Sequence, residues 1–377
     1  MAQEMETEVE RLRGEVVRLQ QRVLAQQMEL DNLKNQSGPA DHAHERGSNN
    51  VDDLGGADLL WRACPPLKCS VVRPHLVTLG DTIYVGGGNT PNQEMCRRVH
   101  KLVPGADKWE SLPITPYLTF ALAGVNGHPT VIGGVNIISS LTSADLLHFD
   151  ADVNKWKKTL PPMPTRRRAA SATTLRNNLV VAGGIHEEDG KSYLSTVEVL
   201  DTEKQLWSRV CSLPKPTNFM SMTSCELTDR IYLLGGLSKQ GSIRSVFSCV
   251  FTDLLNSASP SSDGETTRDA KSEPDSRVWE DIAQTPYHRM GCITISGRLV
   301  VASGLDKGNQ ATRPVYVLDP ISRKWETVGE MAAARSSCSL VSRGRGRLMV
   351  VGGYIDPRHW IASLTTDVME CINLKLE

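Results

Sequence analysis

Glycine-rich turns after apolar runs are the first feature of this sequence that could take part in chemistry. Residues 179–184 read Leu-Val-Val-Ala-Gly-Gly, and residues 83–88 end in three glycines. Backbone N–H groups in such a turn can cradle a phosphate when the turn opens a helix. The sequence has neither a GxGxxG nor a GxxxxGK[ST] pattern at these turns. A nucleotide-binding loop is therefore not indicated.

Motifs of hydrolases and metal sites are also missing. The sequence contains no GxSxG elbow and no HExxH helix, and its nine cysteines are dispersed, without a CxxC pair or zinc spacing. Cys225, Cys292 and Cys338 fall on predicted inner strands, where buried structural thiols are usual. We expect a protein that is not an enzyme and that holds no metal or other cofactor.

Composition narrows the classes of partner and compartment. Lys plus Arg total 42 and Asp plus Glu total 43, so no excess of positive charge favours nucleic acid or an anionic membrane. No apolar run approaches the roughly 20 residues of a membrane span. The acidic start, MAQEMETEVE, does not resemble a secretory signal. Scattered thiols without a signal favour a cytoplasmic location.

The elements that would position any site are internal repeats. The glycine motif recurs six times, at 83–88, 130–134, 179–184, 231–236, 299–304 and 348–353. A tryptophan precedes each copy, at Trp61, Trp109, Trp156, Trp207, Trp279 and Trp325. A period near 50 residues with short strands and glycine turns is typical of a β-propeller, in which each unit covers the faces of its neighbours.

These residues closely resemble kelch repeats, which combine a glycine pair after the second strand with a tryptophan on the fourth. The resemblance extends from Leu59 to Glu377 and implies an all-β, six-bladed kelch propeller over residues 59–377. The last unit lacks a tryptophan strand of its own, whereas Leu59–Cys64 has no earlier strands. We therefore expect this N-terminal strand to complete the sixth blade and close the ring, which leaves no long exposed edge.

Residues 5–34 carry a heptad pattern with β-branched residues at a and leucine at d, which favours a parallel two-stranded coiled coil. The predicted seam contains Val9, Leu12, Val16, Leu19, Val23, Leu30 and Leu33. A single amphipathic helix lying on the propeller is the alternative. Residues 1–34 are thus a predicted homodimerising coiled coil. Residues 35–58, nearly free of apolar side chains, are a predicted flexible linker.

A serine-rich acidic insert occupies residues 253–276, inside the fourth repeat. It carries six Asp or Glu against one Arg and one Lys. We interpret it as a disordered loop between the third and fourth strands of that blade. Ser262 and Ser272, each followed by acidic residues, are candidate phosphorylation sites.

The expected binding surface is the propeller face formed by the loops after strands two and four, which kelch proteins commonly use for partners. Counting back sixteen residues from each glycine pair gives a position rich in aromatic and arginine residues, types that dominate interface energy. The predicted partner-binding residues are Tyr117, Arg166, Arg167, Arg168, Asn218, Phe219, Tyr287, His288, Arg289, Arg335 and Trp360. Packing against the neighbouring blade is the competing interpretation of the same side chains.

The resemblance therefore implies a scaffold that binds protein or peptide partners, with an arginine-rich rim suited to acidic or phosphorylated segments. No segment resembles the BTB and BACK domains of many kelch ubiquitin-ligase adaptors. The alternatives are a cytoskeletal cross-linker and, less favoured, a propeller enzyme such as a sugar oxidase or a mutarotase. For the oxidase, the adjacent Tyr287 and His288 are suggestive, but no convergent set of two Tyr, two His and one Cys can be assigned.

Deleting residues 1–34 is expected to convert a dimer into a monomer, because the heptad seam is the predicted dimer contact. Size-exclusion chromatography with light scattering should give twice the mass of one chain for the full protein and one chain for the truncated form. A full-length protein that elutes as a monomer would contradict the predicted coiled-coil dimer.

Overall fold

The computed structural model describes residues 59–90, 97–186, 192–257, 276–319, 322–343, 347–355 and 368–371. All of them belong to one compact unit, Gly56–Glu377. The predicted coiled coil and linker, Trp360 and residues 258–275 of the insert lie outside the described residues.

Six four-stranded antiparallel sheets make up most of the described chain. The first contains β2 (His75–Leu79), β3 (Thr82–Gly86), β4 (Val99–Leu102) and β5 (Glu110–Ser111). The second contains β7 (Ala121–Val125), β8 (His128–Ile132), β10 (Leu146–Asp150) and β11 (Lys155–Lys157). The third contains β12 (Ser171–Leu175), β13 (Asn178–Ala182), β16 (Thr196–Asp201) and β17 (Leu206–Ser212).

The remaining sheets follow the same meander, and short hairpins extend from three of the six. The fourth sheet contains β18 (Ser221–Cys225), β19 (Arg230–Leu234), β22 (Ser245–Val250) and β23 (Glu280–Gln284). The fifth contains β24 (Gly291–Ile295), β25 (Arg298–Ala302), β26 (Thr312–Leu318) and β27 (Trp325–Arg335). The two-stranded hairpins are β6 (Tyr117–Leu118) with β9 (Val135–Asn136), β14 (Ile185–His186) with β15 (Ser192–Tyr193), and β20 (Leu237–Ser238) with β21 (Gly241–Ser242).

The sixth sheet joins the two ends of the repeat region. It contains β28 (Ser339–Ser342), β29 (Leu348–Val351), β30 (Val368–Cys371) and, at its outer edge, β1 (Trp61–Cys64). Trp61 pairs with Cys371 and Cys64 with Val368 in an antiparallel register. The chain segment that precedes the first repeat therefore supplies the outer strand of the last sheet.

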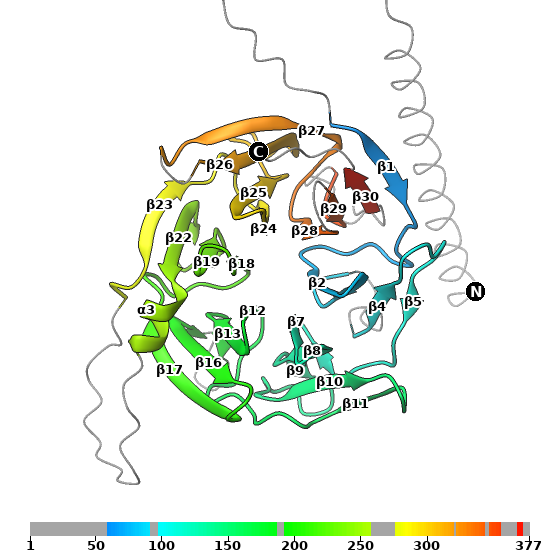
Figure 1. The fold of residues 1–377 in the computed structure, drawn as a ribbon, viewed down its shortest axis with the longest axis vertical. Helices are drawn as coiled ribbons and strands as arrows, with labels where there is room; N and C mark the ends of the chain where they lie inside the picture. The colour runs from blue at the N-terminus through cyan, green and yellow to red at the C-terminus, as the bar shows by residue number, and fades with distance from the viewer. Residues whose placement is uncertain are drawn as a thin grey trace, which may run out of the picture. The chain divides into compact units, whose positions relative to one another are not determined.

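The six sheets surround a common centre (Figure 1). Their first strands lie innermost and contact one another in a closed cycle, which runs β2, β7, β12, β18, β24, β28 and back to β2. The core lies between neighbouring sheets rather than within one. Val180 of the third sheet, for example, packs in one apolar cluster with Ile231 of the fourth. After their first residue the second strands are mainly apolar and buried, as Leu179–Ala182 of β13 shows, because both of their faces are covered.

In four of the six repeats the first glycine of the pair is in close backbone contact with the segment that leads into the next sheet, and these glycines are Gly87, Gly133, Gly183 and Gly352. Gly183 has a φ of +61°, and a Cβ built there would lie 2.3 Å from the carbonyl oxygen of Thr217 in the fourth sheet. The N–H of Gly184 donates to the same carbonyl at 2.9 Å. Only glycine combines that conformation with that approach. The pair therefore has a structural role and does not form a phosphate loop.

The repeated tryptophans form a second belt of contacts between sheets. The indole N–H of Trp207 donates to the carbonyl of Pro161 in the preceding segment at 2.9 Å, and that of Trp61 donates to Glu330 at 2.7 Å. The same bond joins Trp109 to Pro65, Trp156 to Pro113 and Trp325 to Gln284, while Trp279 donates to the sulfur of Cys211. Every repeat thus satisfies its indole N–H with an acceptor in the neighbouring repeat.

The predicted insert begins later than the sequence indicated. Residues 253–256, assigned to a disordered loop, belong to a short helix, α3 (Phe251–Asn256). Phe251 and Leu254, one helical turn apart, are fully buried against the third and fourth sheets, so apolar burial extends the order past β22. No helix among the described residues meets the length and hydropathy of a membrane span.

Replacing Trp61 by Ala is expected to lower the free energy of unfolding by about 2–3 kcal/mol, somewhat less than for a fully buried tryptophan. The substitution removes the indole that attaches β1 to Glu330 of the fifth sheet. Urea unfolding measures the effect, with Ala63→Ser, a change at an exposed position of β1, as the control. Equal midpoints for the Trp61 variant and the wild type would show that β1 does not help to close the ring.

Candidate partner-binding site at the channel mouth

Four of the predicted partner-binding side chains are buried in the structure. Tyr117, Arg167, Asn218 and Arg335 are all at most 2% exposed. In this conformation their side chains cannot touch a partner. The predicted rim therefore needs to be corrected residue by residue.

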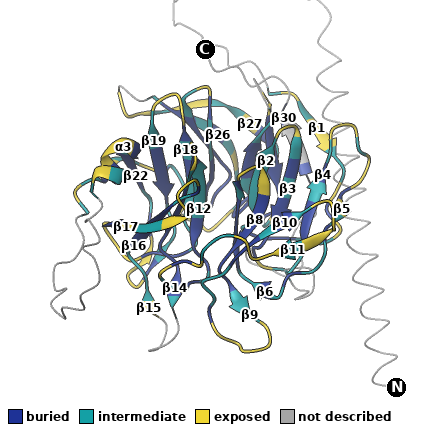
Figure 2. Ribbon diagram, turned by 60° about the horizontal axis from the view of Figure 1, so that its bottom comes forward, coloured by how far each residue is buried: buried dark blue, intermediate teal, exposed yellow. Residues whose placement is uncertain are grey.

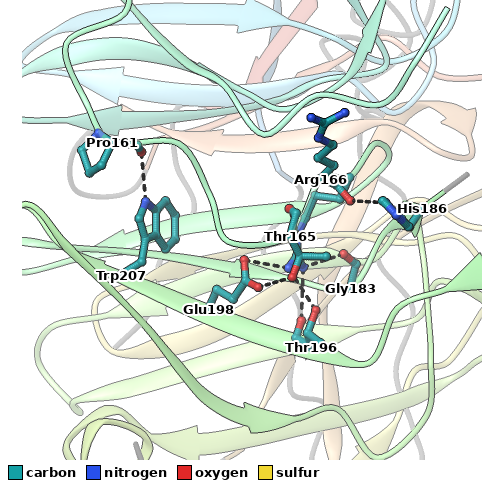
Figure 3. Close-up of polar contacts among 9 residues, drawn as sticks. Pro161, Thr165, Arg166, Gly183, His186, Thr196, Glu198 and Trp207 are labelled. Carbon is teal, nitrogen blue, oxygen red and sulfur yellow. Dashed lines mark hydrogen bonds and ion pairs between the residues drawn. The ribbon is translucent and has the colours of Figure 1, made fainter. Parts of the chain in front are cut away.

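Arg167 is the clearest correction, because its guanidinium is held entirely by its own protein. It forms an ion pair with Glu198 at 2.8 Å and donates to the carbonyl of Gly183 at 2.9 Å and to the hydroxyl of Thr196 at 2.9 Å. Burial lowers the pKa of Arg167, while the adjacent Glu198 carboxylate acts in the opposite direction. Figure 3 shows Glu198, Thr196 and Gly183 gathered around these contacts. The side chain of Arg166 extends away from them.

Arg335 and Tyr117 occupy matching buried places in other sheets. Arg335 donates to the carbonyl of Gly352 at 3.3 Å, as Arg167 does to Gly183. The hydroxyl of Tyr117 donates to Asp145, which also contacts Lys158 at 2.7 Å. Burial, reinforced by the hydrogen bond to Asp145, raises the pKa of Tyr117. Arg167 and Arg335 each join the segment that leads into an inner strand to the glycine turn of that same sheet. Tyr117 joins the equivalent segment to Asp145.

A difference in turn length explains why the sixteen-residue count mixed two positions. In the third sheet two residues separate the first two strands, whereas four separate β18 from β19 in the fourth. Backbone hydrogen bonds of four second glycines identify the true equivalents. Their N–H groups donate to the carbonyls of Val71, Arg167, Thr217 and Arg335, each in the segment that leads into the next inner strand. Thr217 is therefore the counterpart of Arg167, and Phe219 belongs to a different ring.

That second ring surrounds the mouth of the central channel. One residue per sheet, just before each inner strand, has a left-handed backbone with φ between 50° and 59°. The six are Arg73, Thr119, Ala169, Phe219, Arg289 and Ser337. Backbone hydrogen bonds link neighbours around the ring, from the N–H of Phe219 to Ala169 at 3.1 Å and from that of Arg73 to Ser337 at 2.8 Å.

All six mouth residues line a cavity of about 120 Å³. Deeper in, its wall is formed by the first residues of the inner strands, including His75, Ser171 and Ser221. The two serine hydroxyls donate to carbonyls of the next sheet, Ser171 to Met220 at 2.6 Å and Ser221 to Met290 at 3.2 Å. Because these hydroxyls are engaged in the wall, the groups best placed to meet a ligand are those at the mouth.

The mouth is cationic. The guanidinium of Arg73 lies over the ring of Phe219, 4.8 Å from its centroid, and Arg289 stands beside them. Burial, followed by repulsion from Arg289, lowers the pKa of Arg73 to about 10, so it remains charged at neutral pH. Burial lowers the pKa of His75 to about 4, which keeps that ring neutral. No Asp or Glu is among the residues described as lining the cavity.

The other predicted partner-binding residues differ in how far their side chains are exposed to solvent. Arg166 and Arg289 are exposed, and Arg168, His288 and Phe219 are half-buried. Tyr287 is half-buried and packs against Tyr316, with ring centroids 6.1 Å apart. Trp360 lies outside the described residues. Sequence reasoning missed Arg73, Thr119 and Ser337. The signal was present, since Arg73 stands directly before the Pro74 that leads into β2, but sixteen residues before Gly87 the count falls on Val71.

An apolar loop adjoins the mouth at the same end of the sheets. Ile138 is 88% exposed, and Ile137 and Leu141 beside it are also exposed. Asn136 holds the loop, because its side-chain oxygen accepts the N–H of Ile138 at 2.9 Å. Figure 2 shows this loop projecting beyond β9. A well-bonded loop that displays isoleucine to solvent is typical of an interaction surface.

The described residues offer few elements of catalysis. No group of three or more His, Cys, Asp or Glu that could hold a metal ion occurs among them. Cys225, Cys292 and Cys338 are buried free thiols, and burial raises the pKa of Cys292, which disfavours the reactive thiolate. What the mouth does provide is guanidinium groups, an aromatic face and room for a small ligand group.

Comparison with known proteins gives a consistent picture. A family model described as the KLHDC2/KLHL20/DRC7 Kelch-repeats domain matches residues 119–353. Beta-scruin of Limulus polyphemus is 25% identical over 189 residues, which cover 48% of this chain and 20% of that protein. Kelch-like protein 41b of Danio rerio is 26% identical over 231 residues, covering 59% and 33%. The chain thus spans a third or less of these relatives.

The fold itself also has a match among solved structures. The structure of YjhT superposes with a TM-score of 0.59 and covers 81% of this chain and 95% of that one. The two sequences are 16% identical, so the likeness concerns the fold alone.

Replacing Arg167 by Ala is expected to cost about 3–5 kcal/mol of stability, because it leaves the buried Glu198 carboxylate without its ion-pair partner. The adjacent Arg166→Ala is the matched control, and we expect a change of no more than about 0.5 kcal/mol for this exposed side chain. Denaturant unfolding of both variants measures the difference. Similar stability for the two variants would contradict the buried ion pair.

Proposed function

Because the chain belongs to the kelch-repeat family, we propose that it is a non-enzymatic scaffold, a six-bladed propeller that binds a protein partner at the channel mouth. Each of the six four-stranded sheets is one blade, and β1 closes the ring. The partner-binding surface is the end of the propeller from which the loops after strands two and four emerge. Its centre is the mouth formed by Arg73, Phe219 and Arg289, and its margin includes Arg166 and the loop at Ile138.

The cationic mouth is the observation that carries this proposal. Two guanidinium groups face a cavity of about 120 Å³ that has no acidic lining residue. Uncompensated arginines in a partly desolvated place attract a carboxylate or phosphate more strongly than arginines on an open surface. The stack of Arg73 on Phe219 holds one guanidinium in place, which lowers the entropy cost of binding.

The chemistry of the mouth indicates an acidic partner segment with apolar neighbours. A Glu, Asp or phosphorylated side chain would enter between Arg73 and Arg289, and apolar residues of the partner would cover Phe219 and the Ile138 loop. The cavity accommodates a side chain or a chain end rather than a folded element. Specificity for one sequence would come from the surrounding loops, which differ from blade to blade.

Dimerisation would add avidity to this binding. If the heptad seam from Val9 to Leu33 pairs two chains, each assembly presents two mouths. A partner with repeated acidic segments would then be held at a high effective concentration after the first contact. The predicted location of the protein is the cytoplasm, on the basis of its sequence.

Replacing both Arg73 and Arg289 by Ala is expected to weaken binding of an acidic peptide at least about tenfold, since each charge-assisted hydrogen bond contributes about 1.5–3 kcal/mol. The probe is a fluorescein-labelled hexaglutamate peptide, and its fluorescence anisotropy is measured at low salt. The control is Lys155→Ala with Lys324→Ala, which removes the same charge from two exposed positions, the first residue of β11 and the turn before β27.

Equal losses in the two double variants would show that the mouth has no special role and that net charge alone attracts the peptide. Unchanged affinity in the arginine variant would contradict the proposed site. Thermal unfolding of both variants in the absence of peptide checks that the fold is retained.

A further inference from the structure

A second cavity, of about 160 Å³, lies between the fourth and fifth sheets, at the end opposite the channel mouth. Its walls come from the turn before β19, the starts of β23 and β25, and the turn before β27. The lining residues are Thr228, Arg230, Tyr232, Glu280, Ile282, Gly297, Arg298, Leu299, Leu318 and Arg323. Neither the repeat architecture nor the proposed partner face accounts for this cavity.

Three arginines from three separate segments line the cavity, against a single acidic residue. Glu280 forms an ion pair with Arg323 and lies 3.9 Å from Nη1 of Arg230. Arg230 also donates to the hydroxyl of Ser248 at 2.9 Å. The side chain of Arg298 forms no hydrogen bond or ion pair with any described residue. The lining therefore carries two positive charges more than it neutralises.

The other lining residues of the cavity also favour the binding of an anion. Leu299, Leu318 and Ile282 supply apolar surface, which lowers the local dielectric and raises the strength of charge interactions. Tyr232 is only 6% exposed, and burial raises its pKa, so its hydroxyl stays protonated. A protonated hydroxyl can donate a hydrogen bond to an anion.

We propose that this cavity is a binding site for a phosphoryl group. A phosphoryl group carries a charge of about −1.5 to −2 and three strong acceptor oxygens, which match the surplus of two charges and the forked donors of the arginines. A carboxylate, with one charge, would leave part of the surplus uncompensated. Arg298, whose guanidinium is unengaged, is the principal ligand, and Arg230 and Arg323 keep Glu280 turned towards themselves.

Two sources could deliver a phosphoryl group to this place. One is a free phosphorylated small molecule. The other is the chain itself, since the insert of residues 258–275 connects Ser257, after α3, to Ser276, just before β23, and carries Ser262 and Ser272. Glu280 of the cavity wall is the first residue of β23, so the insert joins the fold at the same end as the cavity.

The test uses full-length, unphosphorylated protein and isothermal titration calorimetry. The probes are inorganic phosphate, a peptide of residues 258–275 phosphorylated at both serines, and the same peptide without phosphate. Arg298→Ala is expected to weaken binding of the phosphorylated probes at least about tenfold, through loss of charge-assisted hydrogen bonds. Lys155→Ala, an exposed substitution on the second sheet, is expected to leave it unchanged.

Because Arg298 has no partner among the described residues, the ligand-free Arg298 variant is expected to melt at the temperature of the wild type, which separates lost binding from lost folding. Wild-type affinity in the Arg298 variant, or no binding of either phosphorylated probe to the wild type, would overturn the proposal. Tighter binding of the phosphopeptide than of inorganic phosphate would assign the source to the insert, and equal affinity would assign it to a free ligand.

Discussion

The close approach of neighbouring sheets at the glycine pairs is the constraint on which the whole structure depends. At four of the six junctions a glycine with a positive φ lets one backbone come within hydrogen-bond distance of the next, as Gly184 does with Thr217. The N–H of the first glycine is satisfied within its own sheet, as in the bond from Gly183 to Thr196, whereas the N–H of Gly184 depends on the neighbouring segment. The tryptophans at the outer edge also depend on a neighbour, because each indole N–H donates to an acceptor in the adjacent repeat. Stability is therefore a property of the closed ring rather than of one repeat.

The same constraint separates structural arginines from those free to bind. Arg167 and Arg335 lie a few residues before the inner strands and are buried. Both donate hydrogen bonds to backbone carbonyls, and Arg167 also forms an ion pair with a carboxylate. The residue two positions later has a left-handed backbone, and its side chain lines the mouth of the channel. Arg73 and Arg289 stand at that position. A shift of two residues thus changes an arginine from a buried clamp into a candidate ligand for an anion.

The sequence predicted the architecture better than it predicted the site. Repeated glycine pairs and tryptophans indicated an all-β kelch propeller, because both features report contacts that every unit must make. The site prediction chose Phe219 where Thr217 is the counterpart of Arg167. The turn before β19 is two residues longer than the matching turn of the third sheet, and a fixed count cannot detect this. Burial of Arg167 was also hidden, because its partner Glu198 is 31 residues away in sequence and meets it only through the pairing of β13 with β16. Order in α3 was missed because the acidic composition of the insert outweighed the apolar spacing of Phe251 and Leu254.

Site-specific photo-cross-linking tests the central claim, that the partner sits over the channel mouth, most directly. Phe219 would be replaced by p-benzoylphenylalanine, an aromatic for an aromatic, and Leu227, 80% exposed in the turn before β19, would carry the same group at the opposite end. Irradiation in cell extract, followed by mass spectrometry, should give a defined cross-linked protein for the Phe219 position, competed by hexaglutamate, and not for Leu227. Cross-links at Leu227 alone would place the partner at the opposite end and contradict the account.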